Sequence, residues 1–233
     1  MLRAQDFRLI SAQVVLFLSD PKAFSQPQFL ATMLGHFAGR YDGPVQALPF
    51  QDDVAAEIPR VILQSQDGQW KLQASLNRID SFWFSNDLST QNIDIITDCV
   101  EVLRKYMETF PHIQITRLGF VVRHLNETEN PAGELIDHFC NPKVKATLFN
   151  ASESFEILNH EKYKLRNTPF TINSLVRCQS GMISNPSKKG TIVEQDINTI
   201  EGDMQNKFAL ENVLMFYEEC KHEIEYLLQK YFS

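Results

Sequence analysis

The chain has 233 residues, of which 43% are hydrophobic and 22% are charged. These are ordinary values for a globular protein, and they argue against a disordered chain or a repeat array. The formal net charge of -7 argues against binding along a nucleic-acid phosphate backbone, which depends on a basic surface. No apolar run approaches the roughly twenty residues of a membrane-spanning helix, and we find neither the basic leader nor the cleavage site of a signal peptide. We therefore expect a cytoplasmic protein without a membrane segment.

The four cysteines lie about forty residues apart, without a CxxC pair or a histidine at metal-ligand spacing. This spacing predicts buried thiols in a reducing compartment. The six histidines show no HExxH arrangement, and the sequence contains no GxSxG, P-loop or GxGxxG motif. The sequence therefore predicts no metal, no cofactor and no catalytic residue.

The first predicted strand runs from Phe7 to Leu18. Its second half is continuously apolar, VVLFL, which is typical of a central strand covered on both faces. A short helix is predicted from Pro27 to Phe37, because proline suits the first helical turn and the following apolar residues recur at helical spacing. The stretch from Tyr41 to Pro59 contains several prolines and acidic residues, and we expect it to be a surface connection.

The segment from Arg60 to Phe84 has the clearest strand pattern. Asp67-Gly68 separates two alternating runs and is favoured in a two-residue type I′ turn, so a hairpin is predicted around it. Leu76-Asn77 leads into a third strand. Because Phe82 and Trp83 must fall on opposite faces of that strand, its outer face is partly aromatic and needs cover from a helix, a partner or a ligand. A covering helix is the favoured alternative.

A second helix is predicted to run to Phe110, with Ser89 or Thr90 as its N-cap. The strand from Ile113 to Leu125 follows, and its alternation places Arg117 and Arg123 on one face. Two interpretations are open: the arginines bind an anion, or they pair with carboxylates of a neighbouring strand. The second is favoured.

A polar break at residues 126–130 separates an N-terminal lobe, 1–125, from a C-terminal lobe, 126–233, and we expect the two to form one compact unit. A short helix is predicted from Pro131 to Phe139. A second antiparallel meander then follows in three strands, at Phe155–Leu165, Phe170–Ile183 and Thr191–Ile200. The connection before the last strand contains Lys188 and Lys189 and is predicted to be a flexible loop. These lysines would suit nucleic acid, but the overall charge argues against it.

The last predicted strand places Glu194 and Asp196 on one face, two residues apart. Two such carboxylates are able to hold a hard cation such as Mg²⁺. They would also pair with Arg117 and Arg123 across a sheet without any metal. We favour this pairing, because a partly buried charge within a strand is costly unless it has a partner.

The C-terminal helix, predicted from about Phe208 to Phe232, has the most regular periodicity. Its apolar residues recur at alternating spacings of three and four residues and form a narrow seam. The seam consists of Leu210, Val213, Tyr217, Cys220, Ile224, Leu227 and Tyr231. It either pairs with its copy in a homodimer or packs on the protein's own sheet. The second alternative is favoured, because Leu214, Phe216 and Leu228 widen the apolar stripe.

Four short motifs follow one another along the chain. They are a strand pair of the form S-x-D-G-x-x-x-L-Q-x-x-x-N-R, a strand beginning T-R-L-G, a late D-I-D-like strand and a C-terminal helix with a histidine. The residues concerned are Ser65, Asp67, Gly68, Leu72, Gln73, Asn77, Arg78, Thr116, Arg117, Leu118, Gly119, Arg123, Asp196, Ile197, Asn198, His222 and Phe232. In these motifs the chain resembles a sporadically distributed family of uncharacterised bacterial proteins of about this length. It departs from the family pattern at Val121 and Val122, where tyrosine and asparagine are expected, and at Asn198, where a second acid is expected. The resemblance implies the same architecture and a bacterial or mobile-element origin, and no particular activity.

The sequence therefore predicts an α+β fold in which two antiparallel β-meanders pack against amphipathic helices, with a long C-terminal helix. For function, we favour a non-catalytic accessory or regulatory protein that binds another protein or its own copy, in a bacterial defence or toxin-related system. Its interaction surface would consist of Phe82, Phe84, Leu210, Val213, Tyr217, Ile224 and Leu227. The alternative is a small-molecule or nucleotide-binding protein or a metal-dependent hydrolase with an arginine- and acid-lined cleft. That cleft would be lined by Arg78, Arg117, Arg123, Glu194 and Asp196.

Overall fold

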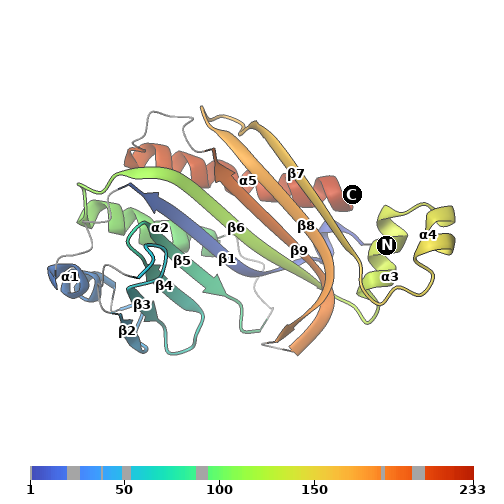
Figure 1. Ribbon diagram of the computed structural model, residues 1–233, viewed down its shortest axis with the longest axis horizontal. Helices are drawn as coiled ribbons and strands as arrows, with labels where there is room; N and C mark the ends of the chain where they lie inside the picture. Colours follow the sequence, from blue (N-terminus) through green and yellow to red (C-terminus); the bar gives the residue numbers. More distant parts are fainter. Residues whose placement is uncertain are drawn as a thin grey trace.

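The computed structural model describes residues 2–19, 27–37, 39–48, 54–87, 94–184, 187–200 and 208–233. Its strands are β1 (Arg8–Leu18), β2 (Val45–Ala47), β3 (Val61–Gln64), β4 (Trp70–Ala74), β5 (Arg78–Phe84), β6 (Ile115–Glu127), β7 (Glu156–Lys164), β8 (Thr171–Ser184) and β9 (Ser187–Thr199). All of them belong to one sheet, in the order β2-β3-β4-β5-β1-β6-β9-β8-β7, and every neighbouring pair is antiparallel. The two predicted meanders are thus present, and β1 and β6 join them in the middle of the sheet (Figure 1).

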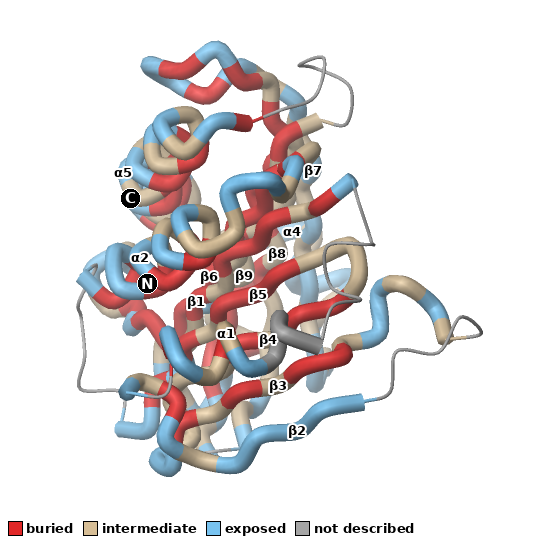
Figure 2. Tube along the Cα trace, turned by 90° about the vertical axis from the view of Figure 1, so that its left-hand side faces the viewer, coloured by how far each residue is buried: buried red, intermediate tan, exposed pale blue. Residues whose placement is uncertain are grey.

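The helices are α1 (Pro27–Phe37), α2 (Asp94–Thr109), α3 (Pro131–Phe139), α4 (Pro142–Leu148) and α5 (Leu210–Phe232), and a short 3-10 turn, η1 (Ala4–Asp6), precedes β1. Figures 1 and 2 show α2 and α5 on the same face of the sheet. This arrangement confirms the predicted α+β class and the long C-terminal helix. None of the helices in the described residues has the length and apolar character needed to cross a bilayer.

The hydrophobic core lies between this face of the sheet and the helices. Leu16 of β1, Phe120 of β6, Leu103 of α2 and Phe216 of α5 are all fully buried in it. Since alternate residues of a strand point to opposite faces, the neighbours of Leu16 and Phe120 along their strands point away from the helices.

The apolar seam of α5 packs within the chain. Val213, Tyr217, Ile224 and Leu227 are at most 3% exposed, which is the arrangement expected if the helix lies on its own sheet. The Tyr217 hydroxyl also accepts a hydrogen bond from the Val15 N–H (3.2 Å) and donates one to the Val15 carbonyl (2.7 Å). These four seam residues are therefore unavailable to a partner in this structure.

The hairpin between β3 and β4 is present, but the predicted type I′ turn is wrong. The Ser65 N–H donates to the Trp70 carbonyl (2.9 Å), so four residues form the loop between them. Gly68 has a positive φ of 72°, whereas Asp67 does not, and a type I′ turn requires both. The Asp67 carboxylate instead accepts hydrogen bonds from the Ser65 hydroxyl (2.6 Å) and the Gln69 N–H (2.9 Å).

The predicted cover of the sheet is also wrong. In the described part of the chain, the helices lie on one face of the sheet, so β1 and β5 have no helical cover on the other face. Apolar residues of β1 are nevertheless buried on the uncovered side. Val15 is only 2% exposed there, because neighbouring side chains shield it.

Three further expectations concern segment boundaries. The predicted flexible loop with Lys188 and Lys189 is wrong, because both lysines lie in β9, and Lys188 forms an ion pair with Glu127 (2.8 Å). The predicted cap, Ser89 or Thr90, lies outside the described residues. The division into lobes 1–125 and 126–233 stays a prediction, and both segments contribute strands to the single sheet.

Candidate functional site

The sheet face opposite α2 and α5, which we call the open face, carries all five polar residues predicted to bind a ligand. Arg78 comes from β5, Arg117 and Arg123 from β6, and Glu194 and Asp196 from β9. They alternate along their strands with buried core residues such as Ile79, Leu118 and Val193. The alternation in the sequence therefore grouped these residues on one side of the sheet.

Two of the arginines meet at the ring of Phe17, which lies opposite both of them in the sheet register. The guanidinium carbon of Arg117 is 4.4 Å from the ring centroid, and that of Arg78 is 5.2 Å from it. Gly119 leaves room for the ring, because a Cβ at that position would lie 3.3 Å from the Val15 Cβ and 3.5 Å from a ring carbon of Phe17. The N-R and T-R-L-G motifs thus converge on one aromatic ring.

The two arginines differ in their polar partners. Arg78 donates to the carboxylate of Asp80 (Nη2 to Oδ1, 2.6 Å), which also accepts from the Gln13 amide (2.7 Å). Burial raises the pKa of Asp80, and the hydrogen bonds from Arg78 and Gln13 oppose that rise. Arg117 has no carboxylate partner in the described part of the chain, and its buried Nε has no hydrogen-bond partner there. Arg117 therefore contacts the ring of Phe17 but no carboxylate among the described residues.

At the other end of β6, arginines and acids alternate in a chain of ion pairs. The Arg123 Nε lies 2.6 Å from Glu194, Arg177 of β8 lies 3.7 Å from the same carboxylate, and the Arg177 Nε lies 3.1 Å from Glu156. The pairing expected for Arg123 and Glu194 is present.

The second expected pair, between Arg117 and Asp196, is not seen among the described contacts. Asp196 lies opposite Val121 and Leu175 and accepts a hydrogen bond from the Asn198 amide (3.1 Å). Since Arg117 and Arg123 are six residues apart, about 20 Å along an extended strand, the five residues do not converge in one cleft. They form two separate groups on a shared surface.

An aromatic pair lies on the same face at β5. Phe82 and Phe84 are stacked, with ring centroids 5.9 Å apart and an interplanar angle of 10°. Phe84 is 38% exposed, and the Lys71 ammonium lies 5.6 Å from the centroid of Phe82. Exposed aromatic rings of this kind are enriched at protein–protein interfaces.

A groove of about 630 Å³ continues from Phe84 to the end of the open face where β8 meets β9. Its apolar lining includes Ile10, Phe84, Met182, Ile183 and Ile192. Polar residues lie among them, notably Asn86, Arg123 and Gln179. Met182 is 70% exposed, so this end of the face offers apolar surface to a ligand or partner.

The thiols and acids offer little nucleophilic or metal chemistry. Cys99, Cys178 and Cys220 are buried, as predicted, whereas Cys140 is partly exposed. Burial raises the pKa of Cys99 and of Cys178 to about 12, so both thiols are protonated at neutral pH and are weak nucleophiles. Within the residues that the structure describes, no group of three or more histidines, cysteines and acids is placed to hold a metal ion.

Some residues of the open face were not identified from the sequence. Phe17 lies within an apolar run that is typical of a core strand, and Asp80 was not singled out from the sequence. Arg177 and Glu156 lie on strands whose register could not be read. A useful signal was available for Asp80, since Arg78 lies two residues before it on the same strand face.

No model of a known protein family matches the chain, and no curated protein matches it. Among solved structures, the chain is similar to Methanococcus jannaschii TBP, with 95% of each chain covered, 8% sequence identity and a TM-score of 0.29. A similarity with so low a TM-score supports no inference about this chain.

Proposed function

We propose that the protein is a non-catalytic binding protein that docks a protein partner on the open face of its sheet. The observation that carries the proposal is the absence of helical cover over this face in the described part of the chain. A bare sheet face with exposed aromatic and apolar side chains is a typical interaction surface.

The open face also indicates the chemistry of the partner. Arg117 lacks a carboxylate partner among the described residues, so it suits an acidic side chain. About 20 Å along the strands, Phe84 and Met182 suit an apolar side chain. We therefore expect a partner segment that presents a carboxylate near Arg117 and an apolar residue at the groove. The net charge of -7 favours a protein over nucleic acid as the occupant.

The pairing of the charged residues favours binding over catalysis. Arg78 is held by Asp80, and Arg123 by Glu194, so these side chains already have partners. The groove takes in Arg123, but neither Arg117 nor Asp196 is among its lining residues. The alternative of one arginine- and acid-lined cleft therefore has less support. The bacterial defence or toxin-related setting remains part of the proposal, and it rests on the sequence resemblance.

The test is capture of host proteins on the immobilised full chain, followed by identification of the captured proteins. Arg117→Gln and Phe84→Ala should each abolish capture of the specific partner. Lys143→Gln, on an exposed position of α4, removes the same charge as Arg117→Gln and should leave capture intact. Equal capture by all variants would overturn the proposal, and so would a captured species that is lost on nuclease treatment.

A further inference from the structure

Among the described strands, the sheet ends at β7 with a long unpaired edge. β7 has nine residues without proline, and it is the last strand in the sheet order of the described residues. The opposite edge strand, β2, has only three residues. Long regular edge strands are uncommon, because their free N–H and C=O groups invite pairing with another strand.

The hydrogen bonds at the two ends of β7 show which backbone groups are free. The Leu165 N–H donates to the Phe170 carbonyl (2.9 Å), and the Ser180 N–H donates to the Phe155 carbonyl (2.9 Å). The odd-numbered residues therefore bond to β8, and because bonding alternates along an antiparallel strand, the even-numbered residues face outward. The outward residues are Glu156, Leu158, His160, Lys162 and Lys164.

We propose that a second copy of the chain pairs with β7, antiparallel, about a two-fold axis at His160. In this register Glu156 lies opposite the partner's Lys164, and Leu158 opposite the partner's Lys162. Every outward residue then faces another outward residue, so about ten backbone hydrogen bonds form, two for each pair. In this register Glu156 faces an opposite charge, the partner's Lys164, on each side of the axis, and the outward N–H and C=O groups match along the whole segment.

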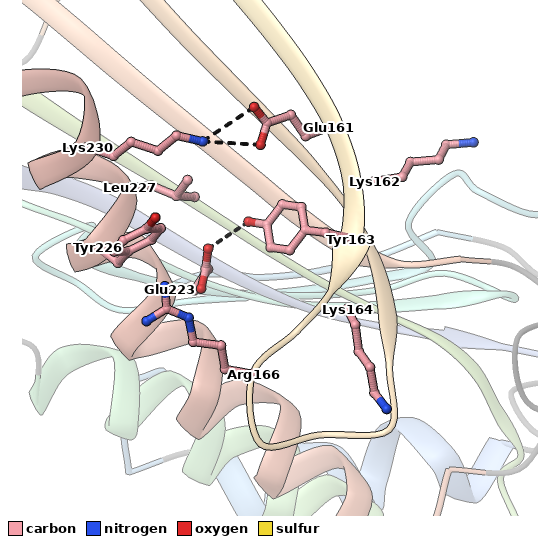
Figure 3. A pocket seen from close by; sticks show the side chains of 9 residues that line it. All are labelled: Glu161, Lys162, Tyr163, Lys164, Arg166, Glu223, Tyr226, Leu227 and Lys230. Atoms are coloured by element: carbon pink, nitrogen blue, oxygen red, sulfur yellow. Dashed lines mark hydrogen bonds and ion pairs between the residues drawn. The ribbon is translucent and has the colours of Figure 1, made fainter.

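The side of β7 that faces α5 supports the same register. Figure 3 shows Glu161 and Tyr163 pointing toward α5 across a pocket of about 410 Å³, while Lys162 and Lys164 point away from it. In the paired arrangement Glu161 lies opposite the partner's Asn159, a hydrogen-bonding pair. Tyr163 lies opposite the partner's Ile157, which adds apolar contact at the pocket.

A copy of the chain fits this edge better than an unrelated strand does. Lysines on an edge strand discourage pairing with apolar strands. In the proposed register the partner's Glu156 lies opposite Lys164 and can form an ion pair with it. Leu158 is 53% exposed and Tyr226, on the rim of the pocket, is 41% exposed, so pairing also gives cover to apolar surface. The edge is a different surface from the open face, and the inference does not depend on the proposed function.

Light scattering of the full chain after size exclusion, over a range of concentrations, tests the pairing. The wild-type chain should approach twice its mass of 26.8 kDa. His160→Pro removes an outward N–H without removing a bond to β8, and should weaken self-association at least tenfold while circular dichroism stays unchanged. His160→Ala keeps the N–H and should remain dimeric. A monomeric wild-type chain, or a dimer that survives His160→Pro, would overturn the proposal.

Disulfide cross-linking tests the register. In a Cys140→Ser background, His160→Cys places two thiols at the axis, where a hydrogen-bonded pair has Cα atoms about 5.5 Å apart, within disulfide range. Lys164→Cys places its thiol about 27 Å from its copy, eight residues along the strand. Oxidation should therefore cross-link the first variant and not the second. Equal cross-linking of both would contradict the proposed axis.

Discussion

The two faces of one sheet differ in what holds their side chains. On the face covered by α2 and α5, the side chains are excluded from water. Phe120 of β6 and Phe216 of α5, for example, are fully buried in the core between the sheet and the helices. On the open face, Phe17 and Asp80 are held by arginines and amides of the same sheet. Burial is thus concentrated on the covered face, and we expect substitutions there to cost more stability than substitutions on the open face.

The largest loss of stability is expected when a ring that packs against the covered face is truncated. Phe216→Ala should destabilise the protein by about 4 kcal/mol, because it removes a fully buried ring of α5 and leaves a cavity. Urea unfolding measures the change. A loss below about 1 kcal/mol would show that α5 is not a main support of the core.

A buried histidine gives the covered face a dependence on pH. His124 of β6 is 9% exposed and its Nδ1 has no hydrogen-bond partner among the described residues, and burial lowers its pKa from 6.5 to about 4. Because the unfolded chain takes up this proton more readily, the contribution is full above pH 6.5 and is lost as the pH falls toward 4. The loss amounts to about 3 kcal/mol.

The measurement is the free energy of unfolding at pH 7 and at pH 4.5. Carboxylates also titrate in this range, so the informative quantity is the difference between the wild type and His124→Leu. The variant should lose about 2 to 3 kcal/mol less on acidification. Equal losses in both proteins would mean that His124 is free to take up a proton in the fold.

A smaller effect is expected at the hydrogen bonds between α5 and the backbone of β1. Tyr217→Phe removes the hydroxyl that serves both the N–H and the carbonyl of Val15, and it should cost about 1 to 2 kcal/mol. Tyr226→Phe, on the exposed side of α5, is the matched control and should change stability by no more than about 0.5 kcal/mol. Thermal unfolding of the two variants side by side decides the matter.

Alternation in the sequence was enough to place the charged residues on their common face. It could not show which face the helices cover, because that depends on how α2 and α5 pack on the sheet. Nor could it pair residues across strands: Arg123 meets Glu194 from 71 positions away, and the register that joins them follows from β6 and β9 becoming neighbours. Phe17 was hidden for the same reason, since its arginine partners come from β5 and β6.

The smallest effect on stability is expected on the open face, where the same substitution should have a large effect on binding. Phe84→Ala removes a ring that is 38% exposed and stacks on Phe82, so it should cost less than about 1 kcal/mol in urea unfolding. The same change should abolish partner capture, because a truncated aromatic anchor typically costs an interface 2 kcal/mol or more. A large loss of stability from Phe84→Ala would mean that the open face supports the fold, and the distinction between a structural face and a binding face would fail.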